Sequence, residues 1–87
     1  MADFATKDDL TLLWRTLKTE EERRAEALLG VVSAALRNEA EKVGKDLDKL
    51  VADSPSYAQV VKSVTVDVVA RTLMTSTDQE QIGRAHV

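Results

Sequence analysis

Residues 13–37 read LWRTLKTEEERRAEALLGVVSAALR, which places a Trp-Arg pair, a helix start and a long amphipathic segment one after another. Thr19 stands three positions before Glu22, the spacing of a capping box in which each side chain satisfies a free backbone N–H of the other residue. Apolar residues then recur at helical spacing as far as Val43. The pattern predicts a helix over about 20–43 that Thr19 caps and Gly44 ends. Its predicted core residues are Leu28, Leu29, Val32 and Leu36.

A shorter helix is expected before this segment. Thr6 precedes Asp8 and Asp9, so its hydroxyl can accept the free backbone N–H of Asp9 while both carboxylates favour the positive helix start. We therefore predict a helix over about 6–14 with Thr6 as its cap. Three apolar residues fall at i, i+3 and i+4, on one face of this helix, and are predicted to enter the core: Leu10, Leu13 and Trp14.

The segment after Gly44 predicts one or two further turns over about 46–52 and then a third main helix. Ser54 followed by Pro55 is typical of an N-cap and a first helical residue, so this helix is expected over about 55–74. The alternation of apolar and polar residues over 64–68, with many valines, leaves a strand as the alternative. The helical face spans more of the segment and predicts these core residues: Tyr57, Val61, Val64, Val68 and Leu73.

Composition describes one small domain of 87 residues, 44% hydrophobic and 31% charged, with a net charge of −3. Its acids and bases are interspersed, which disfavours nonspecific nucleic-acid binding. The absence of cysteine excludes disulfides and thiolate zinc sites. No basic and apolar leader opens the chain, and the longest nearly apolar run, 27–36, is about half of what a membrane helix needs. We expect an all-α domain with neither an export signal nor a membrane span.

Reactive constellations are absent from the sequence. Asp46 and Asp48 resemble the start of a calcium loop, but the glycine and glutamate that such a loop needs at its sixth and twelfth positions are Val51 and Tyr57 here. The serines within the predicted helices lack an activating histidine, and the three glycines form no phosphate-binding loop. We therefore predict no catalytic, cofactor-binding or metal-binding residue, no cofactor and no enzymatic activity.

The last six residues, 82–87, read IGRAHV. Back-translated as ATC GGA AGA GCA CAC GTC and followed by TGA, they match the start of a common short-read sequencing adapter, including its stop. The alternative is an ordinary polar terminus. We predict that 1–81 is the authentic helical domain, that 82–87 is a non-native tail, and that a natural C-terminal segment is missing.

Three segments together resemble the head-tail connector family of tailed phages and prophages, whose members are also called adaptors or head-completion proteins. They are ATKDDLTLLWRTL (5–17), TEEERRAEALLGVVSAALRNEA (19–40) and VVKSVTVDVVARTLM (60–74). The resemblance implies a mainly helical structural protein, made in the bacterial host cytoplasm and located in the virion at the portal vertex of the capsid. Its implied partners are the portal protein, tail or stopper proteins, and further copies of itself in an oligomeric ring.

Such relatives continue past the third helix into an extended, glycine-containing segment that helps to hold the ring together. This segment is missing here, so the 87-residue chain is expected to fold but to oligomerise poorly. The alternative function is a small helical regulatory or DNA-binding module of a prophage or bacterium. That role needs a basic recognition helix, whereas the last predicted helix carries only Lys62 and Arg71 as bases.

Overall fold

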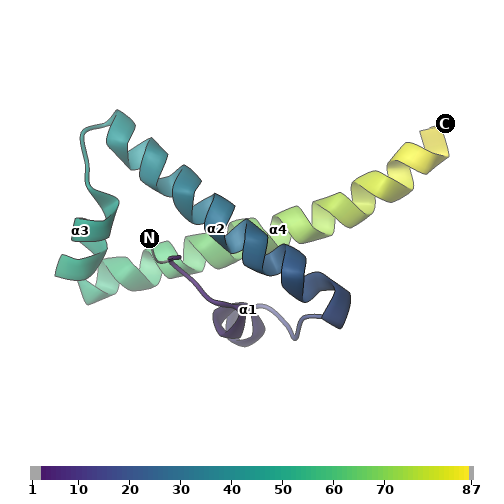
Figure 1. The fold of residues 1–87 in the computed structure, drawn as a ribbon, viewed down its shortest axis with the longest axis horizontal. Helices are drawn as coiled ribbons and strands as arrows, with labels where there is room; N and C mark the ends of the chain where they lie inside the picture. Colours follow the sequence, from purple (N-terminus) through teal and green to yellow (C-terminus); the bar gives the residue numbers. More distant parts are fainter. Residues whose placement is uncertain (1–2, 87) are drawn as a thin grey trace.

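Two long helices cross each other and two short helices complete the domain (Figure 1). The computed structural model describes residues 3–86, and the side chains of residues 3–75. Its elements are α1 (Lys7–Leu13), α2 (Thr19–Lys42), α3 (Leu47–Asp53) and α4 (Pro55–His86), with no strand among the described residues. The all-α prediction and the additional helix near 46–52 are thereby confirmed, and the strand alternative for 64–68 is wrong.

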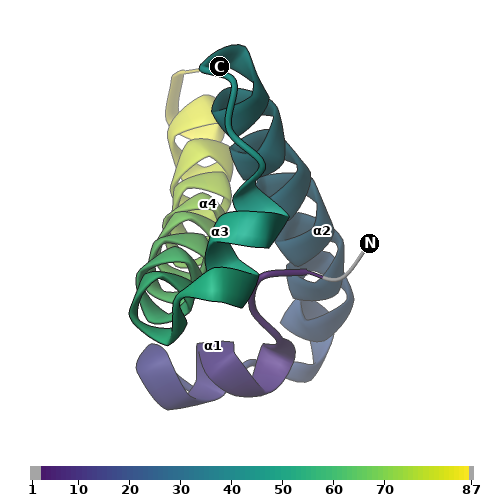
Figure 2. The same ribbon diagram turned by 90° about the vertical axis from the view of Figure 1, so that its left-hand side faces the viewer.

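The long helices α2 and α4 lie side by side, α3 spans one end of the pair, and α1 lies across the other side (Figure 2). The chain is elongated, 48 × 28 × 19 Å, and the C-terminal end of α4 projects beyond α2 (Figure 1). The sequence pattern predicts an end of this helix near residue 74, but α4 continues to His86. Residues 75–82 contain no proline or glycine that would stop the backbone ladder, which explains why the helix runs on.

Two of the three predicted helix caps lie where the sequence places them. The Thr6 hydroxyl accepts the Asp9 backbone N–H at 3.2 Å, and the Asp9 carboxylate accepts the Thr6 N–H at 2.9 Å, forming a complete capping box. The Ser54 hydroxyl accepts the Tyr57 N–H at 3.2 Å at the start of α4. These side chains fix where α1 and α4 begin.

The predicted cap at Thr19 is wrong by one residue. Lys18 precedes the first helical residue of α2, and its backbone N–H donates to the Glu21 carboxylate at 3.0 Å. The predicted pair of Thr19 with Glu22 is therefore replaced by a contact between Lys18 and Glu21. Arg15 holds the Glu21 carboxylate in this position, as described below.

The end of α2 is a Schellman motif, as the glycine after the apolar stripe predicts. Gly44 has φ of +74°, the left-handed region that favours glycine. Its N–H donates to the Glu41 carbonyl at 3.0 Å, and the Lys45 N–H donates to the Ala40 carbonyl at 2.9 Å. The chain can therefore turn sharply into α3.

The core lies between α1, α2 and α4. Its buried residues are Ala5, Leu10, Ala25, Leu29, Val32, Val66, Val69 and Leu73. Four partly buried residues pack against them: Trp14, Leu17, Leu28 and Leu36. Ser33 is also buried and accepts the Phe4 N–H at 3.0 Å, which ties the N-terminal segment to α2.

Four predicted core residues lie on the surface instead. They are Leu13, Tyr57, Val64 and Val68, with exposed fractions of 57, 40, 41 and 38%. Leu13 is exposed because α1 ends there and Trp14 leaves helical geometry. In α4 the buried face includes Thr65, whose hydroxyl donates to the Val61 carbonyl at 2.7 Å. That bond satisfies the only polar group Thr65 would bury, so the helix can turn this residue inward and Val64 outward.

Candidate interaction surface

An open apolar groove lies between the C-terminal half of α2, α3 and the N-terminal half of α4. Its volume is about 300 Å³. Seven apolar or aromatic residues line it, with Glu39 at its edge: Leu36, Ala40, Leu47, Tyr57, Val60, Val61 and Val64. We refer to this set of residues as the apolar groove.

The wall of the groove on α4 carries exposed valines. Val60 is 57% exposed, and Val64 and Val68 follow it at intervals of four residues on the same side of the helix. Single exposed valines are normal on protein surfaces, whereas a contiguous apolar strip beside a groove is typical of an interaction site. The groove is therefore the strongest candidate for a functional surface on the described part of the chain.

The α3 wall of the groove is held against α2 by Arg37. Its guanidinium donates two hydrogen bonds to the Asp48 carboxylate, both of 2.9 Å. The same guanidinium lies 4.3 Å from the centre of the Phe4 ring, in a cation–π contact. The bonds from Arg37 hold the pKa of the Asp48 carboxyl below its ordinary value. Arg37 thus joins the N-terminal segment, α2 and α3, and fixes the shape of the groove.

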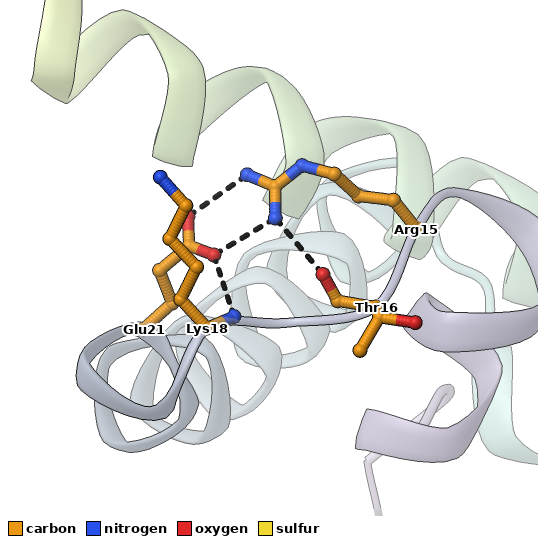
Figure 3. A network of polar contacts seen from close by, with 4 residues as sticks. All are labelled: Arg15, Thr16, Lys18 and Glu21. Atoms are coloured by element: carbon orange, nitrogen blue, oxygen red, sulfur yellow. Dashed lines mark hydrogen bonds and ion pairs between the residues drawn. The ribbon is translucent and has the colours of Figure 1, made fainter.

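A second polar network fixes the connection between α1 and α2 (Figure 3). The Arg15 guanidinium donates to both oxygens of Glu21, at 2.8 and 2.9 Å, and to the Thr16 carbonyl at 3.1 Å. It also lies 4.0 Å from the centre of the Trp14 ring. Hydrogen bonds from Arg15, and then from the Lys18 backbone N–H, lower the pKa of the Glu21 carboxyl to about 2.

This network holds the end of α1, where two leucines are exposed. Leu12 is 81% exposed and Leu13 is 57% exposed. Leu10, opposite Leu12 on this short helix, is completely buried, whereas Leu13 is exposed at the end of the helix although it follows Leu10 at a spacing of three residues. We refer to the two exposed leucines as the leucine knob. The spacing of Leu13 from Leu10 predicts a core residue, so this exposed pair is not evident in the sequence.

Two ion pairs lie near these surfaces. The Lys42 amine lies 3.0 Å from the Glu39 carboxylate at the edge of the groove, and the Lys62 amine lies 3.7 Å from the Asp9 carboxylate. An ion pair therefore stands at the edge of the apolar groove.

Neither a metal centre nor a membrane helix emerges from the geometry. Within the described part of the chain, no group of three or more Asp, Glu or His side chains is arranged to hold a metal ion. None of the described helices combines the length and apolar content that crossing a bilayer requires. That the chain has no catalytic, cofactor-binding or metal-binding residue stays a prediction.

The sequence does not reveal the groove because valines occupy positions on several sides of α4. Of the predicted core residues in this helix, Val61 and Leu73 are buried, whereas Tyr57, Val64 and Val68 line or extend the groove. The signal that could have revealed it is the number of apolar positions: α4 has more of them than one helix face can bury.

Comparison with known proteins identifies a family that the chain matches. The model of a family described as "Phage protein Gp19/Gp15/Gp42" matches residues 13–86. No curated protein and no solved structure matches the chain significantly. The matched range covers α2, α3 and α4 and begins at the last residue of α1. It also includes most of the segment 82–87, whose non-native origin stays a prediction.

Proposed function

Because the chain belongs to the phage protein Gp19/Gp15/Gp42 family, we propose that it is a structural virion protein of the head-tail connector type. In this role it joins the portal vertex of the capsid to the tail, as one subunit of an oligomeric ring. Its partners are further copies of itself, the portal protein, and tail or stopper proteins. The role requires no catalytic residue and no cofactor.

The observation that carries this proposal is the apolar groove on a small phage protein. A domain of 87 residues buries a modest core, so an open apolar groove of about 300 Å³ is costly unless a partner covers it. Ring assembly covers the same surface on every subunit. The three sequence segments that resemble connectors lie in α1, α2 and α4 and the residues beside them, so they make up most of the domain.

The charge pattern favours a structural role over DNA binding. The two bases of α4 whose side chains are described are both paired with acids: Lys62 lies 3.7 Å from Asp9, and Arg71 lies 3.1 Å from Asp67. A recognition helix needs free basic and polar groups facing the DNA. With a net charge of −3, the chain also lacks the electrostatic attraction that nonspecific DNA binding depends on.

Mass spectrometry of purified virions from the phage or prophage that encodes the chain tests this proposal. We expect peptides of the protein in intact particles and in heads separated from their tails, in several copies per particle. Absence from particles, together with salt-dependent retention of the purified protein on DNA, would instead identify the regulatory alternative.

A further inference from the structure

The N-terminal segment of the described chain, residues 3–6, leads from the start of α1 to α2 (Figure 2). The Phe4 N–H donates to the Ser33 hydroxyl oxygen of α2 at 3.0 Å, and Ser33 is completely buried. Ala5 is buried as well and belongs to the core. We refer to residues 3–6 as the N-terminal strap. The strap is therefore docked on α2 by its backbone and by a buried side chain.

The ring of the strap covers a guanidinium that also holds α3. The guanidinium carbon of Arg37 lies 4.3 Å from the centre of the Phe4 ring. The same guanidinium donates two hydrogen bonds of 2.9 Å to the Asp48 carboxylate of α3. Only 11% of the Arg37 side chain is exposed, against 50% of the Asp48 side chain. The arginine is therefore the shielded member that the two contacts share.

This shielding couples the strap to α3. An ion pair in open water contributes little to stability, because solvent screens both charges. The attraction is stronger where one partner is kept from water. Taking the Phe4 ring away exposes the Arg37 guanidinium to water and weakens its hold on Asp48. Coupling between two contacts is reciprocal, so loosening α3 also weakens the docking of the strap.

A change in the position of α3 changes the apolar groove. Leu47 directly precedes Asp48, is 7% exposed, and lines the groove. With seven residues, α3 is too short to be stable as an isolated helix. Its position therefore depends on contacts with the rest of the chain, and the pair with Arg37 is one of them. The docking of the strap thus acts on one wall of the groove.

We propose that the N-terminal strap is a conformational device that sets the shape of the apolar groove. While the strap is docked, Arg37 holds α3 against α2. When the strap is released, α3 loosens and the Leu47 wall of the groove moves with it. A partner that takes up Phe4 then loosens the groove, and a partner that holds α3 in place tightens the strap. This inference goes beyond the proposed function and applies to the isolated chain, so its test needs neither a ring nor a virion.

Hydrogen exchange of single backbone amides, measured by NMR at pH 7 on the full chain, tests this coupling. Phe4→Leu removes the aromatic face but keeps an apolar side chain, whereas Phe4→Tyr keeps the face and is the matched control. The reporter is the Leu50 N–H, which donates to the Asp46 carbonyl in α3. We expect Phe4→Leu to speed up its exchange by about three- to tenfold, the range that corresponds to losing a cation–π contact. Phe4→Tyr should leave the parent rate.

A change on the other side of the arginine tests the reciprocal effect. Asp48→Asn keeps the shape of the side chain and removes its charge. We expect it to speed up exchange of the Phe4 N–H, which donates to Ser33. Asp53→Asn, at an exposed position of the same helix, is the matched control and should not.

The double variant decides whether the two contacts act together. With Phe4→Leu and Asp48→Asn combined, the Leu50 N–H should exchange at the rate of Asp48→Asn alone, because no carboxylate is left for the ring to strengthen. Effects that multiply in the double variant would overturn the inference. An unchanged Leu50 rate in Phe4→Leu would also overturn it, as would an equal acceleration of the Glu21 N–H at the opposite end of α2.

Discussion

At the scale of single residues, the Glu21 carboxylate is the most strongly perturbed acid described, because it accepts two hydrogen bonds from Arg15 and one from Lys18. Its pKa in the folded chain is about 2, against an ordinary value of 4.5. A depressed folded pKa stabilises the fold above the unfolded value, and this contribution is lost as the pH falls through the folded value. We therefore expect the free energy of unfolding to decrease between about pH 5 and pH 2.

Replacing this acid tests the network. We expect Glu21→Gln to lower the free energy of unfolding at pH 7 by about 1–2 kcal/mol, since a charge-assisted pair is lost. The decrease between pH 5 and pH 2 should also become shallower than in the parent chain. Urea denaturation across this pH range measures both effects. Glu20→Gln, at an exposed position in the same turn, is the matched control and should change stability by less than about 0.5 kcal/mol; equal losses in both variants would contradict this account.

At the scale of single elements, Gly30 within α2 and Gly44 after its end should respond to substitution by alanine in opposite directions. A Cβ added at Gly30 would meet only the Asp3 carboxylate, at an ordinary 3.8 Å, whereas Gly44 has a φ of +74°. Gly30→Ala should therefore raise the free energy of unfolding by up to about 1 kcal/mol through helix propensity. Gly44→Ala should lower it by about 1 kcal/mol because alanine is strained in the left-handed region. Urea midpoints that shift in the same direction for both variants would be inconsistent with the structure.

The orientation of α4 gives a second test at this scale. Val69 is fully buried, and its neighbour Val68 is 38% exposed on the groove side. We expect Val69→Ala to cost about 2 kcal/mol in unfolding free energy, and Val68→Ala to cost less than about 0.5 kcal/mol. Thermal or urea unfolding of the two variants measures the difference. If Val68→Ala cost more than Val69→Ala, the buried face of α4 would be the one predicted from the sequence, and the structure would be contradicted.

Helix limits could be predicted because local side chains set them, whereas the face of α4 could not. Thr6, Ser54 and Gly44 act on backbone groups within a few residues, so their effect is visible in the sequence. The rotation of α4 depends on what α1, α2 and α3 cover. Thr65 has a polar side chain but is buried in the core. Because the sequence pattern counts only apolar residues, it placed the buried face at Val64 instead of Thr65.

The leucine knob and the groove were missed for the same physical reason. A pattern of apolar residues predicts burial, but it does not say whether the burial occurs within one chain or between chains. Leu13 and Val64 match a helical core pattern and still lie on the surface. The interaction surface of this chain therefore consists largely of residues that the sequence assigns to its interior.

At the scale of the whole molecule, DNA sequencing can test the origin of residues 82–87 directly. An uninterrupted read of the source DNA across the 3′ end of the gene should show a frame that continues after Gln81 without IGRAHV, beside capsid and tail genes. A natural stop after Val87 among unrelated genes would contradict both the non-native tail and the connector proposal.

The connector role itself is tested most directly by deleting the gene from the phage that encodes the chain and imaging the lysate by electron microscopy. The account predicts filled or partly filled heads separate from free tails, and restoration of tailed particles when the complete natural gene is supplied in trans. Normal tailed particles in the deletion lysate would contradict it.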